Sequence, residues 1–137
     1  KTEMDFINKT IYLNSQNNEE KKELNKLYSQ RVMTKMEERV PYWCNTVGVK
    51  LPSFSVNKAK SRWGICYYYE NRIGLSYMCG VLPETLLDMI ILHEICHFLV
   101  KGHSKDFWAL MEKHMPDLKE RKTLLRKRSK EGISGNI

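Results

Sequence analysis

The sequence has no apolar stretch long enough to cross a membrane. Its longest aliphatic run lies around Met89–Leu92, whereas a spanning helix needs about 20 apolar residues. No signal-peptide pattern opens the chain, although it begins at Lys1 rather than methionine, which suggests a fragment or a processed chain. We therefore expect a cytoplasmic protein that makes no membrane contact.

The sequence lacks any Cys-x-x-Cys pair among its four cysteines. This pattern is typical of reduced thiols in a cytosolic protein rather than of a disulfide framework. We expect Cys44, Cys66, Cys79 and Cys96 to be mostly buried. One alternative stays open, because Cys66 and Cys79 can face each other across a hairpin as a redox pair or a second metal site.

Glycine and proline are also few, seven and four in 137 residues, and the chain has neither repeats nor low-complexity stretches. A chain of this length predicts one domain with a modest core. We assign residues 18–130 to that domain, residues 1–17 to an N-terminal arm and residues 131–137 to a disordered tail.

Hydrophobic spacing predicts an α+β fold. Apolar residues recur at helical spacing from about residue 19 to 45, which indicates a long N-terminal helix that Pro41 kinks or divides. Three segments with strand character follow, at residues 53–58, 62–69 and 72–77. Because Glu70-Asn71 supplies a turn between the last two, we expect a small antiparallel sheet built on a hairpin.

The C-terminal half predicts three helices. The first starts at Pro83 and is apolar nearly all round from Leu86 to Val100, so it should be buried in the centre of the domain. Ser104 can cap the second helix, which runs to about Met115. The third is expected to end at about Lys130.

The most specific motif is the stretch His-Glu-Ile-Cys-His-Phe-Leu-Val-Lys-Gly-His inside this half. His93 and His97 are four residues apart, so on a helix they share one face and can bind one metal ion. Glu94 lies about 100° round the helix, where it can reach a metal-bound water. Gly102 offers a left-handed stop that turns the chain back and delivers His103 as a third ligand.

Three imidazoles with one open position are the ligands of a catalytic rather than a structural zinc site. A lone histidine on an apolar helix face is usually a core residue with a hydrogen-bond partner. Here two imidazoles and a carboxylate share a buried helix, and burying them without partners is costly. The sequence therefore predicts one Zn²⁺ per chain, bound by His93, His97 and His103, with Glu94 as the catalytic residue. Cobalt, nickel and copper suit the same ligands.

Four motifs in a fixed order resemble one known family. They are residues 61–66 (Ser-Arg-Trp-Gly-Ile-Cys), 82–84 (Leu-Pro-Glu), 93–97 (His-Glu-x-x-His) and 103–108 (His-Ser-x-x-Phe-Trp). Together they resemble the YgjP-like (DUF45) zinc metallopeptidase domain, which is related to the SprT/WLM group of zincins. The resemblance covers roughly residues 20–117.

This resemblance implies a zincin-like fold in which His93, His97 and His103 bind zinc and Glu94 is the general base. Ile65 departs from the family pattern, which usually has serine at this position. The ligand spacing also equals that of metzincin proteases. This chain has valine where metzincins have glycine, however, so we do not assign it to them.

Such a site predicts a metallopeptidase acting on a peptide or protein. Glu94 would take a proton from the attacking water and pass it to the leaving amine. The segment Ser61–Cys66 is expected to pair through a strand edge with an extended peptide substrate. Tyr77 and Lys105 are candidate stabilisers of the oxyanion.

The residues around the motif allow two interpretations each. Arg62-Trp63 either contacts substrate or forms a structural corner. Asp88 either orients an imidazole or is an ordinary exposed carboxylate. Phe107 and Trp108 are better explained as core residues that hold the third-ligand turn than as substrate-binding aromatics, and His114 as a surface histidine.

The positive charge is concentrated at the C-terminal end. Residues 118–137 hold seven basic and two acidic residues, which accounts for +5 of the net charge of +7. These cations can bind phosphates, or they form the solvated face of a terminal helix. Two other functions therefore stay open: hydrolysis of a nucleotide or another amide by the same zinc site, and a non-catalytic zinc-stabilised module that contacts nucleic acid through Lys119–Lys130. No oligomeric state is predicted.

Overall fold

The computed structural model describes residues 18–129, so the expected arm (residues 1–17) and tail (residues 131–137) lie outside the described residues. The described chain contains four α-helices, three strands and two 3₁₀ helices. In chain order these are α2 (Asn18–Val47), β1 (Ser53–Asn57), β2 (Gly64–Tyr67), η1 (Tyr68–Glu70), β3 (Arg72–Ser76), η2 (Tyr77–Val81), α3 (Glu84–Cys96), α4 (Lys105–His114) and α5 (Leu118–Ser129). This arrangement confirms the predicted fold class.

The long helix α2 presents one apolar stripe to the core. Its buried residues recur every three or four positions, as helical spacing requires, and are Tyr28, Val32, Met36, Val40, Trp43 and Cys44. Pro41 lies inside the helix without dividing it. The buried residues on both sides of Pro41 hold the chain in place, which offsets the one backbone hydrogen bond that proline removes.

The sheet has the strand order β1-β3-β2. Strands β2 and β3 form the predicted antiparallel hairpin, and Asn71 adopts the left-handed conformation (φ 48°) at its turn. Strand β1 pairs with β3 in parallel, however, so the sheet is mixed rather than wholly antiparallel. The alternation of polar and apolar residues predicts strands but carries no information on pairing direction.

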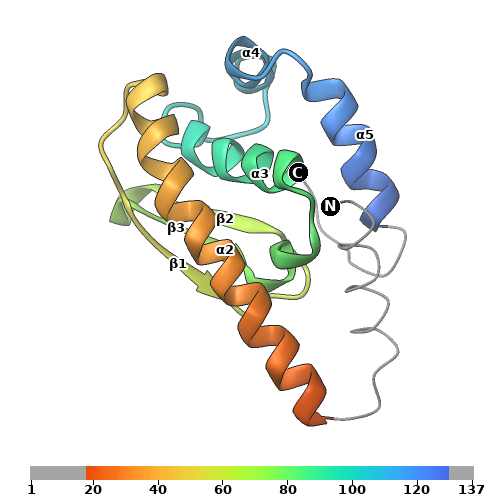
Figure 1. Ribbon diagram of the computed structural model, residues 1–137. Helices are drawn as coiled ribbons and strands as arrows, with labels where there is room; N and C mark the ends of the chain where they lie inside the picture. Colours follow the sequence, from red (N-terminus) through yellow and green to blue (C-terminus); the bar gives the residue numbers. More distant parts are fainter. Residues whose placement is uncertain (1–17, 130–137) are drawn as a thin grey trace.

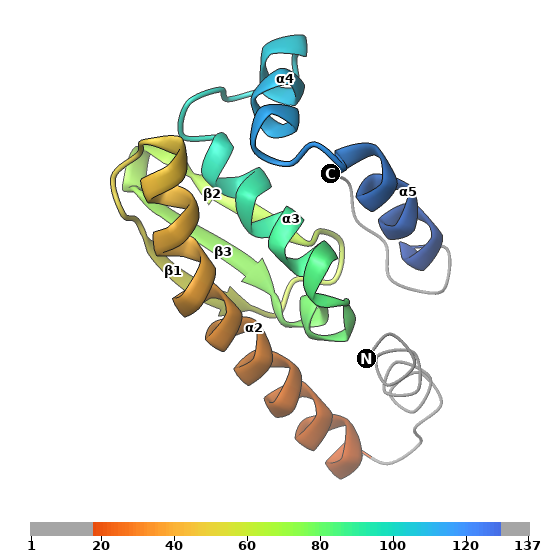
Figure 2. The same cartoon turned by 45° about the horizontal axis from the view of Figure 1, so that its top comes forward.

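Helices α2 and α3 lie side by side across one face of the sheet (Figures 1 and 2). Helix α3 is the central element, and ten of its thirteen residues are buried. The segment η2 leads into it along α2 at very close range, because a Cβ at Gly80 would lie 2.4 Å from the Cβ of Tyr28. Only glycine allows this approach.

Helices α4 and α5 follow α3 at its C-terminal end and then run back beside it (Figure 2). Two arginines of α5 tie it to the start of α3 and to the segment before it. Arg121 donates to the carbonyl of Thr85 at 2.8 Å, and Arg128 donates to the carbonyl of Val81 at 3.4 Å. Within residues 18–129, no helix has both the length and the apolar character needed to span a bilayer.

Candidate metal centre

The three predicted ligands converge on one point. The Nε2 atoms of His93, His97 and His103 form a triangle in which each pair is 3.1 Å apart. Three nitrogen ligands of a tetrahedral zinc ion are separated by roughly 3.3 Å, given the usual Zn–N distance. The nitrogen atoms are therefore spaced as the ligands of one metal ion, and they form a candidate metal group among the described residues.

The backbone orients one of these imidazoles. The Nδ1 atom of His97 lies 2.9 Å from the carbonyl oxygen of Val100. Since a carbonyl only accepts, Nδ1 of His97 must carry the hydrogen, which leaves the lone pair of the neutral ring on Nε2, inside the triangle. The Nδ1 atom of His93 is buried and has no hydrogen-bond partner among the described residues.

Burial also favours the neutral, metal-binding form of His93. Desolvation, and then the neighbouring His97, His103 and Lys122, lower the pKa of His93 to about 2. Desolvation lowers the pKa of His97 as well, against the effect of its backbone hydrogen bond. Three neutral imidazoles with converging lone pairs repel one another, and a cation relieves that repulsion. The residues present therefore fit a zinc ion.

Two aromatic rings from α4 pack against the imidazoles. Phe107 is fully buried and stacks on His97, with ring centroids 4.4 Å apart and an interplanar angle of 18°. Trp108 lies nearly parallel to His103 at 5.8 Å. These contacts agree with the interpretation of Phe107 and Trp108 as residues that hold the turn to His103.

The turn itself differs from the prediction. Helix α3 ends at Cys96, and the next residues fold back by hydrogen bonds from the amides of Leu99 and Val100 to the carbonyl of Cys96. Gly102 does not adopt a left-handed conformation, because Gly48 is the only described glycine with a positive φ. The prediction that Gly102 ends the helix in a left-handed conformation was therefore wrong. The helix ends six residues before Gly102, so no positive φ is needed there.

Glu94 lies beside the triangle and is only 5% exposed. It packs directly over Gly64 of β2, where an added Cβ would lie 2.8 Å from its Oε2 atom. Desolvation raises the pKa of Glu94 to about 8, and the positive charge of Arg62 opposes this rise. Gly64 thus gives the carboxylate its space, which explains a glycine at this point of the strand.

A cleft of about 220 Å³ opens over these groups. Besides the three histidines and Glu94, its walls are formed by Gly64, Ile65, Cys66, Tyr68 and Lys101. Strand β2 is an edge strand of the described sheet and supplies three of these residues. Tyr68 and Lys101 were missed from the sequence, where the only signal was a run of three tyrosines (residues 67–69) before the hairpin turn.

Neither candidate oxyanion stabiliser lines this cleft. Tyr77 lies in η2, is 4% exposed and belongs to the core, because η2 packs against α2 rather than beside the histidines. Lys105 is exposed at the start of α4. Tyr68 is the one tyrosine among the residues lining the cleft.

Asp88 serves neither role considered for it. Its Oδ1 accepts hydrogen bonds from Arg39 Nε and from Trp43 Nε1, each at 2.8 Å, and its Oδ2 accepts from Arg39 Nη2 at 3.2 Å. The carboxylate therefore joins α3 to α2 and contacts no imidazole. It lies five residues before His93, which turns it to another side of the helix.

The remaining expectations concern cysteines and single side chains. All four cysteines are free thiols, and three are buried. Cys79 is fully buried and its thiol donates to the carbonyl of Trp63 at 3.3 Å, while Cys66 faces the cleft, so no Cys66–Cys79 pair forms.

Trp63 is 1% exposed, which supports a structural corner. His114 lies outside the metal group.

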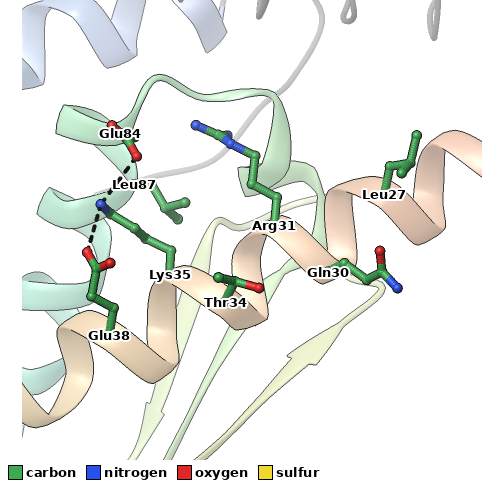
Figure 3. A pocket seen from close by; sticks show the side chains of 8 residues that line it. All are labelled: Leu27, Gln30, Arg31, Thr34, Lys35, Glu38, Glu84 and Leu87. Atoms are coloured by element: carbon green, nitrogen blue, oxygen red, sulfur yellow. Dashed lines mark hydrogen bonds and ion pairs between the residues drawn. The ribbon is translucent and has the colours of Figure 1, made fainter.

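A second cavity, of about 310 Å³, lies between α2 and the start of α3 (Figure 3). Its charged groups already have partners. Lys35 forms ion pairs with Glu38 at 3.3 Å and Glu84 at 3.6 Å, and Arg31 donates to two backbone carbonyls, of Gly80 at 2.7 Å and Leu82 at 2.6 Å. These contacts fasten two elements together, so this cavity is structural.

Two helices on a small sheet carry three converging imidazoles, of which those of His93 and His97 are buried and that of His103 is exposed, and this arrangement is typical of a metallopeptidase domain. The chain belongs to the YgjP-like metallopeptidase domain family, whose model matches residues 2–128. Among solved structures it is similar to the crystal structure of the metallopeptidase zymogen of Pyrococcus abyssi abylysin, with 19% identity and a TM-score of 0.64 over 74% of this chain and 99% of that chain. No curated protein sequence matches this chain significantly.

Proposed function

We propose that this protein is a zinc-dependent metallopeptidase that hydrolyses peptide bonds at the cleft over His93, His97 and His103. The observation that carries the proposal is the triangle of Nε2 atoms, 3.1 Å apart. The outward hydrogen bond of His97 to Val100 supports it, because that bond directs the lone pair of the ring inward. Membership of a metallopeptidase family supports the choice of a peptide bond.

The chemistry follows from the ligand set and its neighbour. Zinc held by three neutral imidazoles would polarise a substrate carbonyl and lower the pKa of a water toward about 7. Glu94 is the general base: it takes the proton of the attacking water and delivers it to the leaving amine. Its position over Gly64, against the cleft wall, keeps the carboxylate next to the histidines.

The edge of β2 is the proposed docking line for the substrate. Gly64, Ile65 and Cys66 line the cleft, and β3 pairs with only one side of the strand. An extended peptide can therefore add to the free side of β2 by main-chain hydrogen bonds, which places its carbonyl groups along the cleft. Of the predicted docking segment Ser61–Cys66, residues 64–66 lie in β2, whereas residues 61–63 precede the strand.

The contacts of the basic helix α5 favour a structural role for this helix over nucleic-acid binding. Three of its cations are engaged within the domain: Arg121 and Arg128 bind backbone carbonyls, and the Nζ atom of Lys122 lies 3.6 Å from the ring centroid of Trp108. These contacts engage three of the six cations of α5 within the domain, which weighs against the nucleic-acid alternative. A cytoplasmic location stays part of the proposal and is supported by four free thiols.

The test is the substitution Glu94→Gln in zinc-loaded protein. The amide has the size of the carboxylate but cannot accept the proton, so cleavage of a diverse peptide library should fall ~10³-fold while zinc stays bound. Glu112→Gln, on the exposed side of α4, is the matched control and should cleave normally. Unchanged cleavage in Glu94→Gln would contradict the proposal, as would nucleotide hydrolysis by wild-type protein without peptide cleavage.

A further inference from the structure

One end of the cleft carries an aromatic and cationic cluster, formed by Tyr68, Tyr69 and Lys101. The Nζ atom of Lys101 donates to the hydroxyl of Tyr69 at 3.1 Å. It lies 4.8 Å from the ring centroid of Tyr68 and 4.6 Å from that of Tyr69. Tyr69 is 86% exposed and Tyr68 37% exposed, so the cluster faces solvent at the mouth of the site.

The charge of Lys101 has no opposite charge paired with it in the described part of the chain. Among residues 18–129 no carboxylate forms an ion pair with it. The acidic residue of the same hairpin, Glu70, is already paired with Arg72 at 3.0 Å. An ammonium group has three donors, and Tyr69 accepts from one of them. The remaining donors can serve an acidic ligand.

The chain places this cation at a fixed position relative to the histidines. Lys101 directly follows Val100, whose carbonyl orients His97, and precedes His103 by two residues. Tyr68 directly follows the last residue of β2. A peptide paired along β2 would therefore run from the histidine triangle toward Lys101. Tyr68 and Lys101 line the same cleft as the three histidines.

A second cation lies near the other end of the strand. Arg62 precedes β2 by two residues and is close enough to Glu94 to interact with it electrostatically. Glu94 is the one carboxylate among the cleft-lining residues, and it is occupied by the proposed chemistry. The docking line therefore has a positive charge near each end, which attracts acidic peptides and disfavours basic ones.

We propose that the cleft selects peptides with an aspartate or glutamate close to the scissile bond, whose carboxylate binds Lys101 while its methylene groups contact the Tyr68 ring. This inference rests on the proposed peptidase function. It names the substrate class that the same site prefers.

The experiment compares peptides that differ only at one position near the cleavage site, with glutamate, glutamine or lysine there. Wild-type protein should cleave the glutamate peptide with a kcat/KM ~10-fold above that of the glutamine peptide, mainly through KM. Lys101→Met should abolish this difference, and Lys101→Glu should shift the preference to the lysine peptide. Lys113→Met, on the exposed side of α4, is the matched control and should keep the wild-type preference.

Two control measurements keep the outcomes separate. Bound zinc and thermal unfolding should be the same in the Lys101 variants as in wild-type protein, because Lys101 belongs neither to the metal centre nor to the core. Cleavage by wild-type protein without preference for glutamate, or an unchanged preference in Lys101→Met, would overturn this inference and leave the peptidase proposal standing. No cleavage of any peptide by zinc-loaded wild-type protein would overturn both.

Discussion

Helix α3 carries two polar groups that are built in opposite ways. Toward α2, the carboxylate of Asp88 is enclosed by three donors from Arg39 and Trp43, at 2.8 to 3.2 Å. Toward the cleft, the Nε2 atoms of His93 and His97 face each other and a third imidazole, with no other partner between them. The first group is complete within the protein, whereas the second requires an additional cation.

Whether a buried polar group finds its partners within the protein indicates function better than its degree of burial does. Both groups lie in a helix whose surroundings are apolar, where an unpaired polar atom is costly. At Asp88 the protein supplies opposite charge and hydrogen-bond donors. At the histidines it supplies acceptors that point at one another and an outward bond that holds one of them in this orientation. A group of like acceptors that the fold holds together is typical of a metal site.

The strongest way to break this comparison is to remove one ligand. His93→Ala takes one nitrogen from the triangle, and we expect zinc affinity to fall on the order of 10³-fold, because each ligand carries a large share of the binding free energy. Chelator competition measures the change. His114→Ala, outside the metal group, should keep wild-type affinity, and a loss below ~10-fold for His93→Ala would contradict the assignment.

The next effect is on stability and involves Asp88. Asp88→Ala leaves the guanidinium of Arg39 and the indole nitrogen of Trp43 without their acceptor, so the free energy of unfolding in urea should fall by about 2 kcal/mol. Zinc affinity should stay at the wild-type level. Asp106→Ala, at an exposed position, should cost less than ~1 kcal/mol. If Asp88→Ala weakened zinc binding instead, the two polar groups would not be separate.

A smaller effect, on kcat, is expected from a substitution at Gly64, which lies beneath Glu94. Gly64→Ala places a Cβ 2.8 Å from Oε2 of Glu94, so the carboxylate must shift. We expect kcat for peptide cleavage to fall roughly 10-fold with zinc affinity unchanged, since only the position of the base is altered. Gly102→Ala is the control, because a Cβ there meets nothing within 4 Å. Equal activity of both variants would show that Glu94 tolerates displacement.

The smallest effect concerns the support behind the third ligand. The Nζ atom of Lys122 lies 3.6 Å from the ring centroid of Trp108, which in turn stacks on His103. Lys122→Met should lower the free energy of unfolding by about 0.5 to 1 kcal/mol through loss of the cation–π contact. Lys127→Met, on an exposed side of α5, should have no measurable effect. Equal stability of the two variants would show that the contact adds nothing.

Local patterns explain what the sequence predicted well. The helices at residues 18–47, 84–96, 105–114 and 118–129 follow from hydrophobic spacing and terminal residues, and their limits differ from the expected ones by few residues. The exception is the end of α3. We read the helix as apolar through Val100, but it ends at Cys96 because the chain must turn to bring His103 back.

Contacts between distant segments explain what the sequence did not show. Nothing local in residues 53–57 distinguishes parallel from antiparallel pairing with β3. Asp88 reads as an exposed carboxylate because its partners lie 45 and 49 residues away in the chain. Lys101 and Tyr69 contact each other across 32 residues, and each alone is an ordinary surface residue.

Local sequence patterns account for how the residues of the candidate site come together. His93, Glu94 and His97 are placed by the period of one helix, and His103 by a short turn, so their relation depends on local geometry. The surroundings of these four residues depend on tertiary packing. It placed Gly64 beneath Glu94, Asp88 on another side of α3, and Tyr68 with Lys101 at the end of the cleft. These relations depend on how the sheet packs on α3, and packing is decided by the whole core rather than by any one segment.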